Sequence, residues 1–250
     1  MKPLLTLLRR ELAGFFQHMT GYVIIAAVML VIGLSYVAVV LAINGEAVDT
    51  PITEAVYSTP FFWLIILLAA PAITMRSYAN ERSSGTYETL MTAPVTSWEV
   101  VLAKFLGAWI FFMVVWLPFI GYMFALRPYF DDPSLLDLRV LASTVLGVSL
   151  LSGLYVAIGC LASSLTRSQM LSAMIAFALG MVLFLQSFVT FQLPEDLSVW
   201  NTVFQRTSLF IHLEDFVRGI VDSRHVLFYV SLTAFFLYLN WQTIESRRWL

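Results

Sequence analysis

The sequence predicts an all-α polytopic membrane protein with six transmembrane helices in a single domain, residues 1–250. Hydrophobic residues make up 60% of the 250 residues and charged residues only 12%, which lies outside the usual range of soluble domains. Six apolar runs are each long enough to cross a hydrocarbon core of about 30 Å as a helix. They cover residues 19–43, 59–75, 100–126, 140–163, 170–191 and 226–242.

The distribution of basic residues predicts that both termini lie in the cytoplasm (N-in, C-in). An even number of spans leaves the two ends of the chain on one side of the membrane. Placing them inside also places most of the 14 lysine and arginine residues inside, as the positive-inside rule requires.

The first 18 residues predict a short helix that lies along the cytoplasmic interface. Leucine and phenylalanine residues surround Arg9, Arg10 and Glu11, a pattern typical of interfacial helices. The alternative is that these residues are the frayed start of the first span. That span exceeds the roughly 7–15-residue apolar region of a signal peptide, which predicts an uncleaved anchor. In the second span, Pro71 predicts a kink or unwinding at the cytoplasmic end.

The outer segments differ in character. Residues 44–58 and 127–139 are short and acidic and leave no room for an outer domain. Residues 192–225 interleave large apolar residues with charged ones, which predicts short amphipathic helices before the last span. Such pieces survive at membrane depth only when packed against protein or lining a water-filled cavity. We expect a re-entrant hairpin here, and an ordinary amphipathic surface loop is the alternative.

Small residues at a spacing of four predict close helix packing in two spans. Four-residue spacing places such residues on one helix face, where they allow neighbouring backbones to approach. Contacts within the chain and contacts between chains both remain open. The two sets are Ser149, Gly153 and Ala157, and Ser172, Ala176 and Gly180.

The spans lack the groups that several function classes need. Apart from Lys104 near one end, the six apolar cores contain no ionisable side chain, which disfavours a proton- or ion-coupled carrier. The chain also lacks the P-loop pattern, so any ATP and its Mg²⁺ must be bound by a partner subunit. Cys160 is the single cysteine and cannot form a disulfide within the chain or a cysteine metal cluster. We expect no catalytic residues, no metal and no cofactor on this chain, and no nucleic-acid partner.

The polar segment 76–104 predicts a short amphipathic helix between the second and third spans. Gly85 or Thr86 can begin it, with Glu88 in its first turn where the helix dipole favours an anion. Pro94 ends it. Its apolar face follows helical spacing and contains Tyr87, Leu90, Met91 and Pro94.

A capping box then opens the third span, because Thr96 is followed three residues later by Glu99. The preceding helix is therefore held between two membrane helices. Its apolar face either inserts into the groove of a partner and transmits motion to both spans, or lies on lipid headgroups.

Two motifs carry a family resemblance. Residues 80–90 read Asn-Glu-Arg-Ser-Ser-Gly-Thr-Tyr-Glu-Thr-Leu and are followed by Pro94 and Lys104. This resembles the E-R-x-x-G-T-x-E-x-L…P…K pattern of type-2 ABC transporter permeases. A second motif resembles the gliding-motility-type branch, whose relatives include the nitrous-oxide-reductase maturation permeases. It contains His212, Asp215, Phe216, Gly219 and Asp222.

The resemblance implies a coupling helix that docks on a separate ABC ATP-binding subunit. It also implies a permease dimer, with a second copy or a paralogue, in the bacterial cytoplasmic (inner) membrane. Segment 192–225 would form the outer re-entrant helices, with an outer-face accessory protein as a further candidate partner beside the lipid bilayer. The residues implied to form or orient the docking contact are Glu81, Arg82, Gly85, Thr86, Tyr87, Glu88, Leu90, Met91 and Pro94.

These observations favour a non-catalytic permease subunit of an ATP-driven ABC exporter. The alternative is an ABC-type membrane scaffold or mechanotransmitter that acts on outer-face partners without moving a solute. A secondary transporter is a weaker alternative. The sequence does not distinguish between lipid, hydrophobic drug and polypeptide as cargo.

Overall fold

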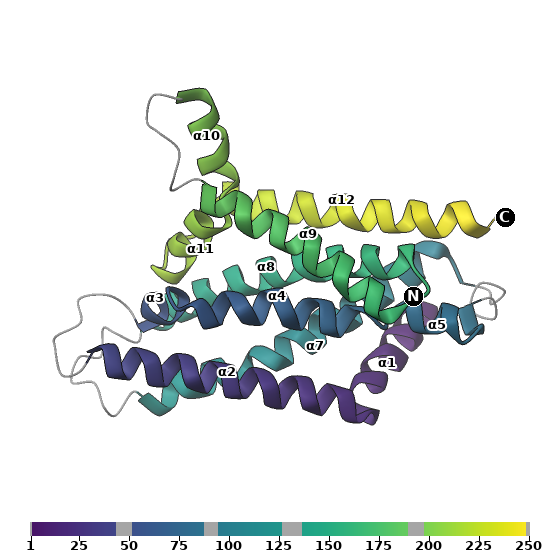
Figure 1. The fold of residues 1–250 in the computed structure, drawn as a ribbon, viewed down its shortest axis with the longest axis horizontal. Helices are drawn as coiled ribbons and strands as arrows, with labels where there is room; N and C mark the ends of the chain where they lie inside the picture. The colour runs from purple at the N-terminus through teal and green to yellow at the C-terminus, as the bar shows by residue number, and fades with distance from the viewer. Residues whose placement is uncertain (1, 44–51, 88–94, 127–136, 190–197, 249–250) are drawn as a thin grey trace.

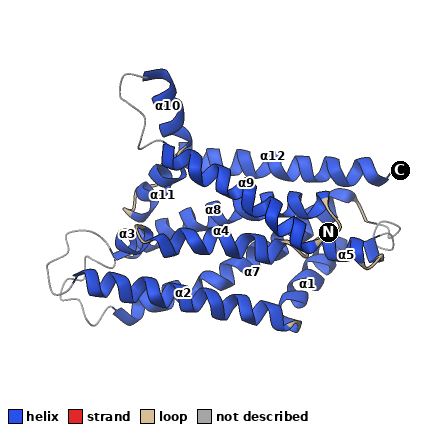
Figure 2. Ribbon diagram, viewed as in Figure 1, coloured by secondary structure: helices blue, strands red, loops and turns tan. Residues whose placement is uncertain are grey.

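The computed structural model describes residues 2–43, 52–87, 95–126, 137–189 and 198–248. Within these ranges the chain forms helices joined by short turns, and no strand (Figure 2). The elements, in order, are α1 Lys2–Gln17, α2 Met19–Ile43, α3 Ile52–Tyr57, α4 Pro60–Thr74, α5 Ala79–Ser83, α7 Ser97–Leu126, α8 Leu138–Leu165, α9 Gln169–Val189, α10 Ser198–Thr207, α11 Leu209–Val217 and α12 Ser223–Arg248.

The long helices lie side by side as a bundle, with α5 and both termini at one end and α3, α10 and α11 at the other (Figure 1). We call these the α5 end and the α11 end. Helix α8 lies at the centre and packs against α4, α7, α9, α11 and α12. Its residues 151–164 are all buried, as expected for a helix that is surrounded by protein on every side.

Five helical segments are long and apolar enough to cross a membrane, and they coincide with the first five predicted spans. They are Met19–Leu41, Pro60–Ser83, Ser97–Phe124, Leu138–Leu165 and Gln169–Phe188. Helix α12 covers the sixth predicted span and has 26 residues, but it does not reach the same threshold because polar residues such as Asn240 and Gln242 lower its hydropathy. The sixth span therefore stays a prediction.

Helix α1 is an element of its own rather than the first turns of α2. It ends at Gln17, and α2 begins at Met19. Helix α1 packs along α7, where the Phe15 ring stacks on Phe111 with 4.5 Å between ring centroids. Gly107 of α7 makes this approach possible, because a Cβ at this residue would lie 2.9 Å from the Glu11 Cβ. Contact of α1 with lipid headgroups stays a prediction.

Helix α4 continues through Pro71 instead of unwinding there. It ends at Thr74, and the Met75 N–H donates to the Pro71 carbonyl at 2.9 Å. Turn residues 75–78 then lead into α5. The chain therefore leaves the helical conformation at Met75 and not at Pro71, where unwinding was predicted.

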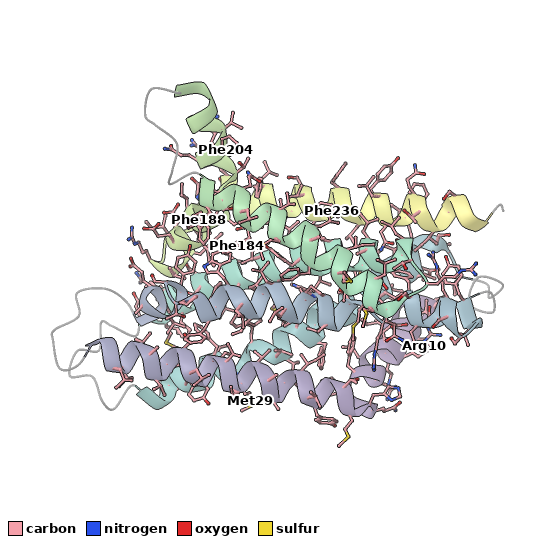
Figure 3. The ribbon with its side chains drawn as sticks, in the orientation of Figure 1. Arg10, Met29, Phe184, Phe188, Phe204 and Phe236 are labelled. Atoms are coloured by element: carbon pink, nitrogen blue, oxygen red, sulfur yellow. The ribbon has the colours of Figure 1, made fainter. Side chains whose placement is uncertain are left out.

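Apolar side chains remain exposed on the outer sides of α2, α9 and α12. Figure 3 shows Met29 on the outer side of α2, where it is 41% exposed, and Phe235 of α12 is 52% exposed. Leu30 of α2 is 63% exposed and Met174 of α9 is 62% exposed. Such continuous apolar surface is typical of contact with lipid or with another membrane helix.

Candidate functional site

Helix α5, which contains the Glu81-Arg82 pair, is fixed at its start by a serine from α8. The buried Ser163 hydroxyl accepts hydrogen bonds from the backbone N–H groups of Tyr78 and Ala79, at 3.0 and 3.1 Å. The same hydroxyl donates to the Met75 carbonyl at 3.2 Å. Because the first N–H groups of a helix lack partners within the helix, Ser163 determines where α5 begins.

Lys104 of α7 lies behind α5 and is the centre of a buried group of charges. Its Nζ atom lies 2.9 Å from Glu81 Oε1 and 3.1 Å from Glu11 Oε1, and it donates to the Ser77 carbonyl at 2.6 Å. The Lys104 side chain is only 2% exposed. Three acceptors thus match the three protons of the ammonium group. Lys104, for which the sequence alone predicted no partner, therefore joins α1, α5 and α7.

Arg10 completes what we call the charge cluster: Arg10, Glu11, Glu81 and Lys104. Its Nη2 atom lies 2.9 Å from Glu11 Oε1 and 3.1 Å from Glu81 Oε1. Figure 3 shows Arg10 where α1 meets α5. Burial alone would raise the pKa of Glu11, but Lys104 and Arg10 outweigh this effect and hold the pKa below its usual value. The charge cluster thus places two basic side chains against two carboxylates.

Two further residues connect α5 to α8 and α9. Arg82 donates through Nη1 to the Ser164 carbonyl of α8. Asn80 Oδ1 accepts a hydrogen bond from Gln169 Nε2 of α9, at 2.9 Å. Helix α5 consequently contacts α1, α7, α8 and α9 through polar groups, although it has only five residues.

The chain after α5 turns at Gly85, whose φ of +72° favours glycine. The Ser84 and Thr86 hydroxyls lie 2.9 Å apart, and Thr86 and Tyr87 are helical, in agreement with a helix start at Gly85 or Thr86. The Tyr87 ring is half-buried and lies 4.9 Å from the Arg82 guanidinium carbon. The remaining predicted docking residues lie outside the described residues: Glu88, Leu90, Met91 and Pro94.

The predicted capping box at the start of α7 is confirmed. Glu99 Oε2 accepts from the Thr96 N–H at 2.9 Å, and Thr96 Oγ1 accepts from the Glu99 N–H at 3.3 Å. Next to it, Trp98 stacks on Trp241 of α12 with 5.2 Å between centroids. The segment between α5 and α7 is thus bounded on both sides by fixed structure.

At the α11 end, the motif residues His212 and Asp215 meet His225 of α12. The His212 and His225 rings lie 4.1 Å apart between centroids, and His225 Nε2 lies 2.8 Å from Asp215 Oδ2. His212 Nε2 donates to the Arg206 carbonyl at 3.1 Å, and within the described part of the chain the buried Nδ1 has no hydrogen-bond partner. Burial and the adjacent His225 lower the pKa of His212 to about 4. We call His212 and His225 the outer histidine pair.

The other three motif residues shape the turn between α11 and α12. Phe216 packs directly on Gly147 of α8, where a Cβ would lie 2.7 Å from the Phe216 side chain. Gly219 has a φ of +87° and ends α11. Asp222 Oδ1 accepts from the Arg224 N–H at 2.8 Å and caps the start of α12.

Helix α3 is attached to α11 by three contacts. Arg218 Nη2 lies 2.7 Å from Glu54 Oε1 and 2.7 Å from Glu214 Oε1. Thr53 Oγ1 donates to the Val217 carbonyl at 2.9 Å, and the Tyr57 hydroxyl donates to the Phe210 carbonyl at 2.8 Å. The short amphipathic helices predicted before the last span are present as α10 and α11, and α11 packs against α3, α8 and α9. The re-entrant hairpin stays a prediction.

Both sets of small residues face helices of the same chain. Trp109 Nε1 of α7 donates to the Ser149 carbonyl at 3.0 Å and would lie 3.4 Å from a Cβ at Gly153. The Tyr155 hydroxyl of α8 donates to the Gly180 carbonyl of α9 at 3.1 Å. The other members are also buried: Ala157, Ser172 and Ala176.

Sequence reasoning missed Glu11, Arg10 and Ser163 as parts of the site. One available signal was Lys104 itself, because an ionisable group within an apolar run needs a counter-charge. Glu11 and Glu81 were acidic residues predicted at the same membrane boundary. Ser163 gave no comparable signal, since serine within a helix more often bonds its own backbone.

Among the described residues, no three His, Cys, Asp or Glu side chains are placed to hold a metal ion.

A family model described as ABC-2 family transporter protein matches residues 43–213, about two thirds of the chain. No curated protein matches the sequence.

Proposed function

The chain belongs to the ABC-2 family of transporter proteins, and we propose that it is the permease subunit of an ATP-driven exporter. A separate ABC subunit would bind ATP and Mg²⁺ and hydrolyse the ATP. The segment between α5 and α7 would dock on that subunit, through the predicted face of Tyr87, Leu90, Met91 and Pro94.

The observation that carries this proposal is the attachment of α5. A force applied to residues 88–94 reaches α5 directly on one side and α7 on the other. From α5 it passes through Glu81 and Lys104 to α1 and α7, and through Ser163 to α8. Packed elements that move as rigid bodies transmit motion in this way. The coupling segment therefore reaches most of the bundle within a few direct contacts.

The proposed arrangement in the membrane rests on the distribution of basic residues and on the family resemblance. The α5 end lies in the cytoplasm with both termini, and α10 and α11 lie at the outer face. Helix α12 is the sixth span, and α11 with α10 forms the re-entrant element before it. Two permeases, either two copies or a copy and a paralogue, pair in the bacterial inner membrane. From the resemblance of the second motif, we also propose that the chain belongs to the gliding-motility-type branch.

The docking assignment is tested by Leu90→Asp in the full-length permease, co-expressed with an ABC ATP-binding subunit that co-purifies with the wild type. A charge on the apolar docking face should abolish co-purification and the permease-dependent part of ATP hydrolysis in proteoliposomes. Leu138→Asp is the matched control, since Leu138 is 70% exposed at the α11 end of α8. Unchanged co-purification and unchanged ATP hydrolysis with Leu90→Asp would show that this face does not dock.

A mechanotransmitter remains the second candidate, and the shape of the α11 end favours it. Helix α10 stands away from the bundle (Figure 1), where an outer-face accessory protein could bind it. The two functions separate in proteoliposomes that contain the permease and its ATPase. ATP-dependent movement of labelled lipid, hydrophobic drug or peptide supports the exporter, whereas hydrolysis without movement of any of them supports the mechanotransmitter.

A further inference from the structure

A cavity of about 600 Å³ opens at the α5 end, beneath the bend between α1 and α2. Its walls come from α1, α2, the last turn of α4, α5 and α7. It lies beside the charge cluster and close to the membrane boundary, where a lipid headgroup and the first carbons of its acyl chains would be found. The cavity has one apolar side and one charged side.

The apolar side continues onto the outer surface of the bundle. Phe15, Ile24 and Ile73 line it together with Val23. Val23 is 61% exposed and belongs to the face of α2 that the bundle leaves uncovered. A molecule that extends from the cavity along Val23 would therefore lie against membrane hydrocarbon, which is favourable for an acyl chain and unfavourable for a polar solute.

The charged side presents one cation that has no carboxylate partner. Arg10 and Lys104 are both paired with Glu11 and Glu81. Arg76 also lines the cavity, and among the described residues its guanidinium forms no ion pair and donates only to Thr20 Oγ1, at 2.9 Å. A guanidinium with free donors is well matched to a phosphate group.

A carboxylate oxygen in the same wall lacks a donor. Glu81 Oε1 lies beside Arg10 and Lys104, but among the described residues the buried Glu81 Oε2 has no hydrogen-bond partner. A buried acceptor left unsatisfied is destabilising. A primary ammonium group brings three donors, whereas a quaternary ammonium group brings none.

We propose that this cavity binds a phospholipid whose headgroup ends in a primary amine, of the phosphoethanolamine class. Its phosphate lies on Arg76, its ammonium donates to Glu81 Oε2, and its acyl chains leave past Val23. The lipid bridges α2, α4 and α5 next to the charge cluster. The inference requires only that the chain lies in a membrane, so it stands or falls separately from the exporter assignment.

The test is lipid retention by the purified full-length permease, measured by native mass spectrometry after titration with phosphatidylethanolamine, phosphatidylcholine or phosphatidylglycerol of identical acyl chains. We expect phosphatidylethanolamine to bind about tenfold more tightly than phosphatidylcholine, because only the primary amine satisfies Glu81. Phosphatidylglycerol should fall between them. Equal retention of phosphatidylethanolamine and phosphatidylcholine would overturn the proposal. Soluble glycerophosphoethanolamine should not displace the lipid, and displacement at equal concentration would show that the acyl chains play no part.

Variants locate the site. Arg76→Gln should weaken phosphatidylethanolamine and phosphatidylglycerol alike. Gly14→Leu should reduce the space in the cavity, because Gly14 lines the cavity and a Cβ there meets no heavy atom within 4 Å. Arg167→Gln, an exposed arginine in the turn between α8 and α9 and outside the cavity, should leave binding unchanged. If Arg76→Gln and Gly14→Leu both retain the lipid as the wild type does, the site is elsewhere.

Discussion

The two ends of the bundle are held together by different chemistry. At the α5 end, the three helices α1, α5 and α7 meet around the charge cluster, with Lys104 2% exposed and paired to two carboxylates. At the α11 end, α11 is held by hydrogen bonds to backbone carbonyls, by Phe216 on Gly147, and by the outer histidine pair. The Arg–Glu group around Arg218 faces solvent, with the Arg218 side chain 47% exposed.

This difference separates a fixed joint from an adjustable one. Buried ion pairs are costly to break one partner at a time, so they hold helices in one arrangement. Exposed ion pairs respond to salt, and a histidine side chain can respond to pH. Under the function proposed above, the α5 end suits transmission of force and the α11 end suits a change in contacts.

The largest effect is expected from Lys104→Met, which leaves Glu11 and Glu81 with only the exposed Arg10. Removing one partner of a buried ion pair lowers the free energy of unfolding by about 3–5 kcal/mol. Thermal unfolding of the detergent-solubilised protein measures this loss. Arg167→Met, at an exposed arginine in the same half of the bundle, is the control and should change little. A Lys104→Met protein as stable as the control would mean that the charge cluster does not join the helices.

The charge cluster also shows which parts of the structure can be predicted from the sequence and which cannot. Apolar runs predicted the long helices well, because burial in protein or lipid selects for the same side chains. The capping box was predictable because its contacts are three residues apart. The Lys104–Glu11 contact joins residues 93 positions apart, and no local pattern encodes such a distance. Residues 88–94, which carry most of the predicted docking face, lie outside the described residues.

The second largest effect comes from the packing of Phe216 on Gly147. Gly147→Ala places a Cβ 2.7 Å from the Phe216 side chain, and overpacking of this kind lowers the free energy of unfolding by about 1–3 kcal/mol. Gly121→Ala is the matched control in α7, since a Cβ there meets no heavy atom within 4 Å. It should be neutral or slightly stabilising, by up to about 1 kcal/mol, because alanine favours the helix. Equal unfolding temperatures for the two variants would contradict the contact.

The outer histidine pair predicts a loss of stability in mild acid. The pKa of His212 is lowered to about 4 in the folded protein, against roughly 6.5 when unfolded. Between these values the unfolded state binds a proton that the folded state does not, so stability falls as pH drops from 6.5 toward 4. From pH 7 to 5.5 the expected loss is roughly 1 kcal/mol.

His212→Gln should remove this part of the pH dependence, whereas His18→Gln, at an exposed histidine of the α5 end, should keep it. Denaturant titrations at pH 7 and 5.5 make the comparison. The groups that face His212 and also titrate, His225, Asp215 and Asp222, are the same in both variants. A wild-type difference that persists in His212→Gln would assign the pH dependence to another group.

The smallest effect is expected at the exposed ion pairs of the α11 end. Arg218 lies 2.7 Å from both Glu54 and Glu214, but its side chain is 47% exposed, and such pairs contribute roughly 0.2–1 kcal/mol because solvent screens them. Arg218→Met should therefore destabilise the protein far less than Lys104→Met, although both substitutions remove a cation placed between two glutamates. The Arg218→Met effect should also shrink in high salt, where exposed charges are screened, while the Lys104→Met effect should persist. Equal losses at the two ends would mean that burial does not distinguish the charge cluster from a surface ion pair, and the fixed joint at the α5 end would lose its physical basis.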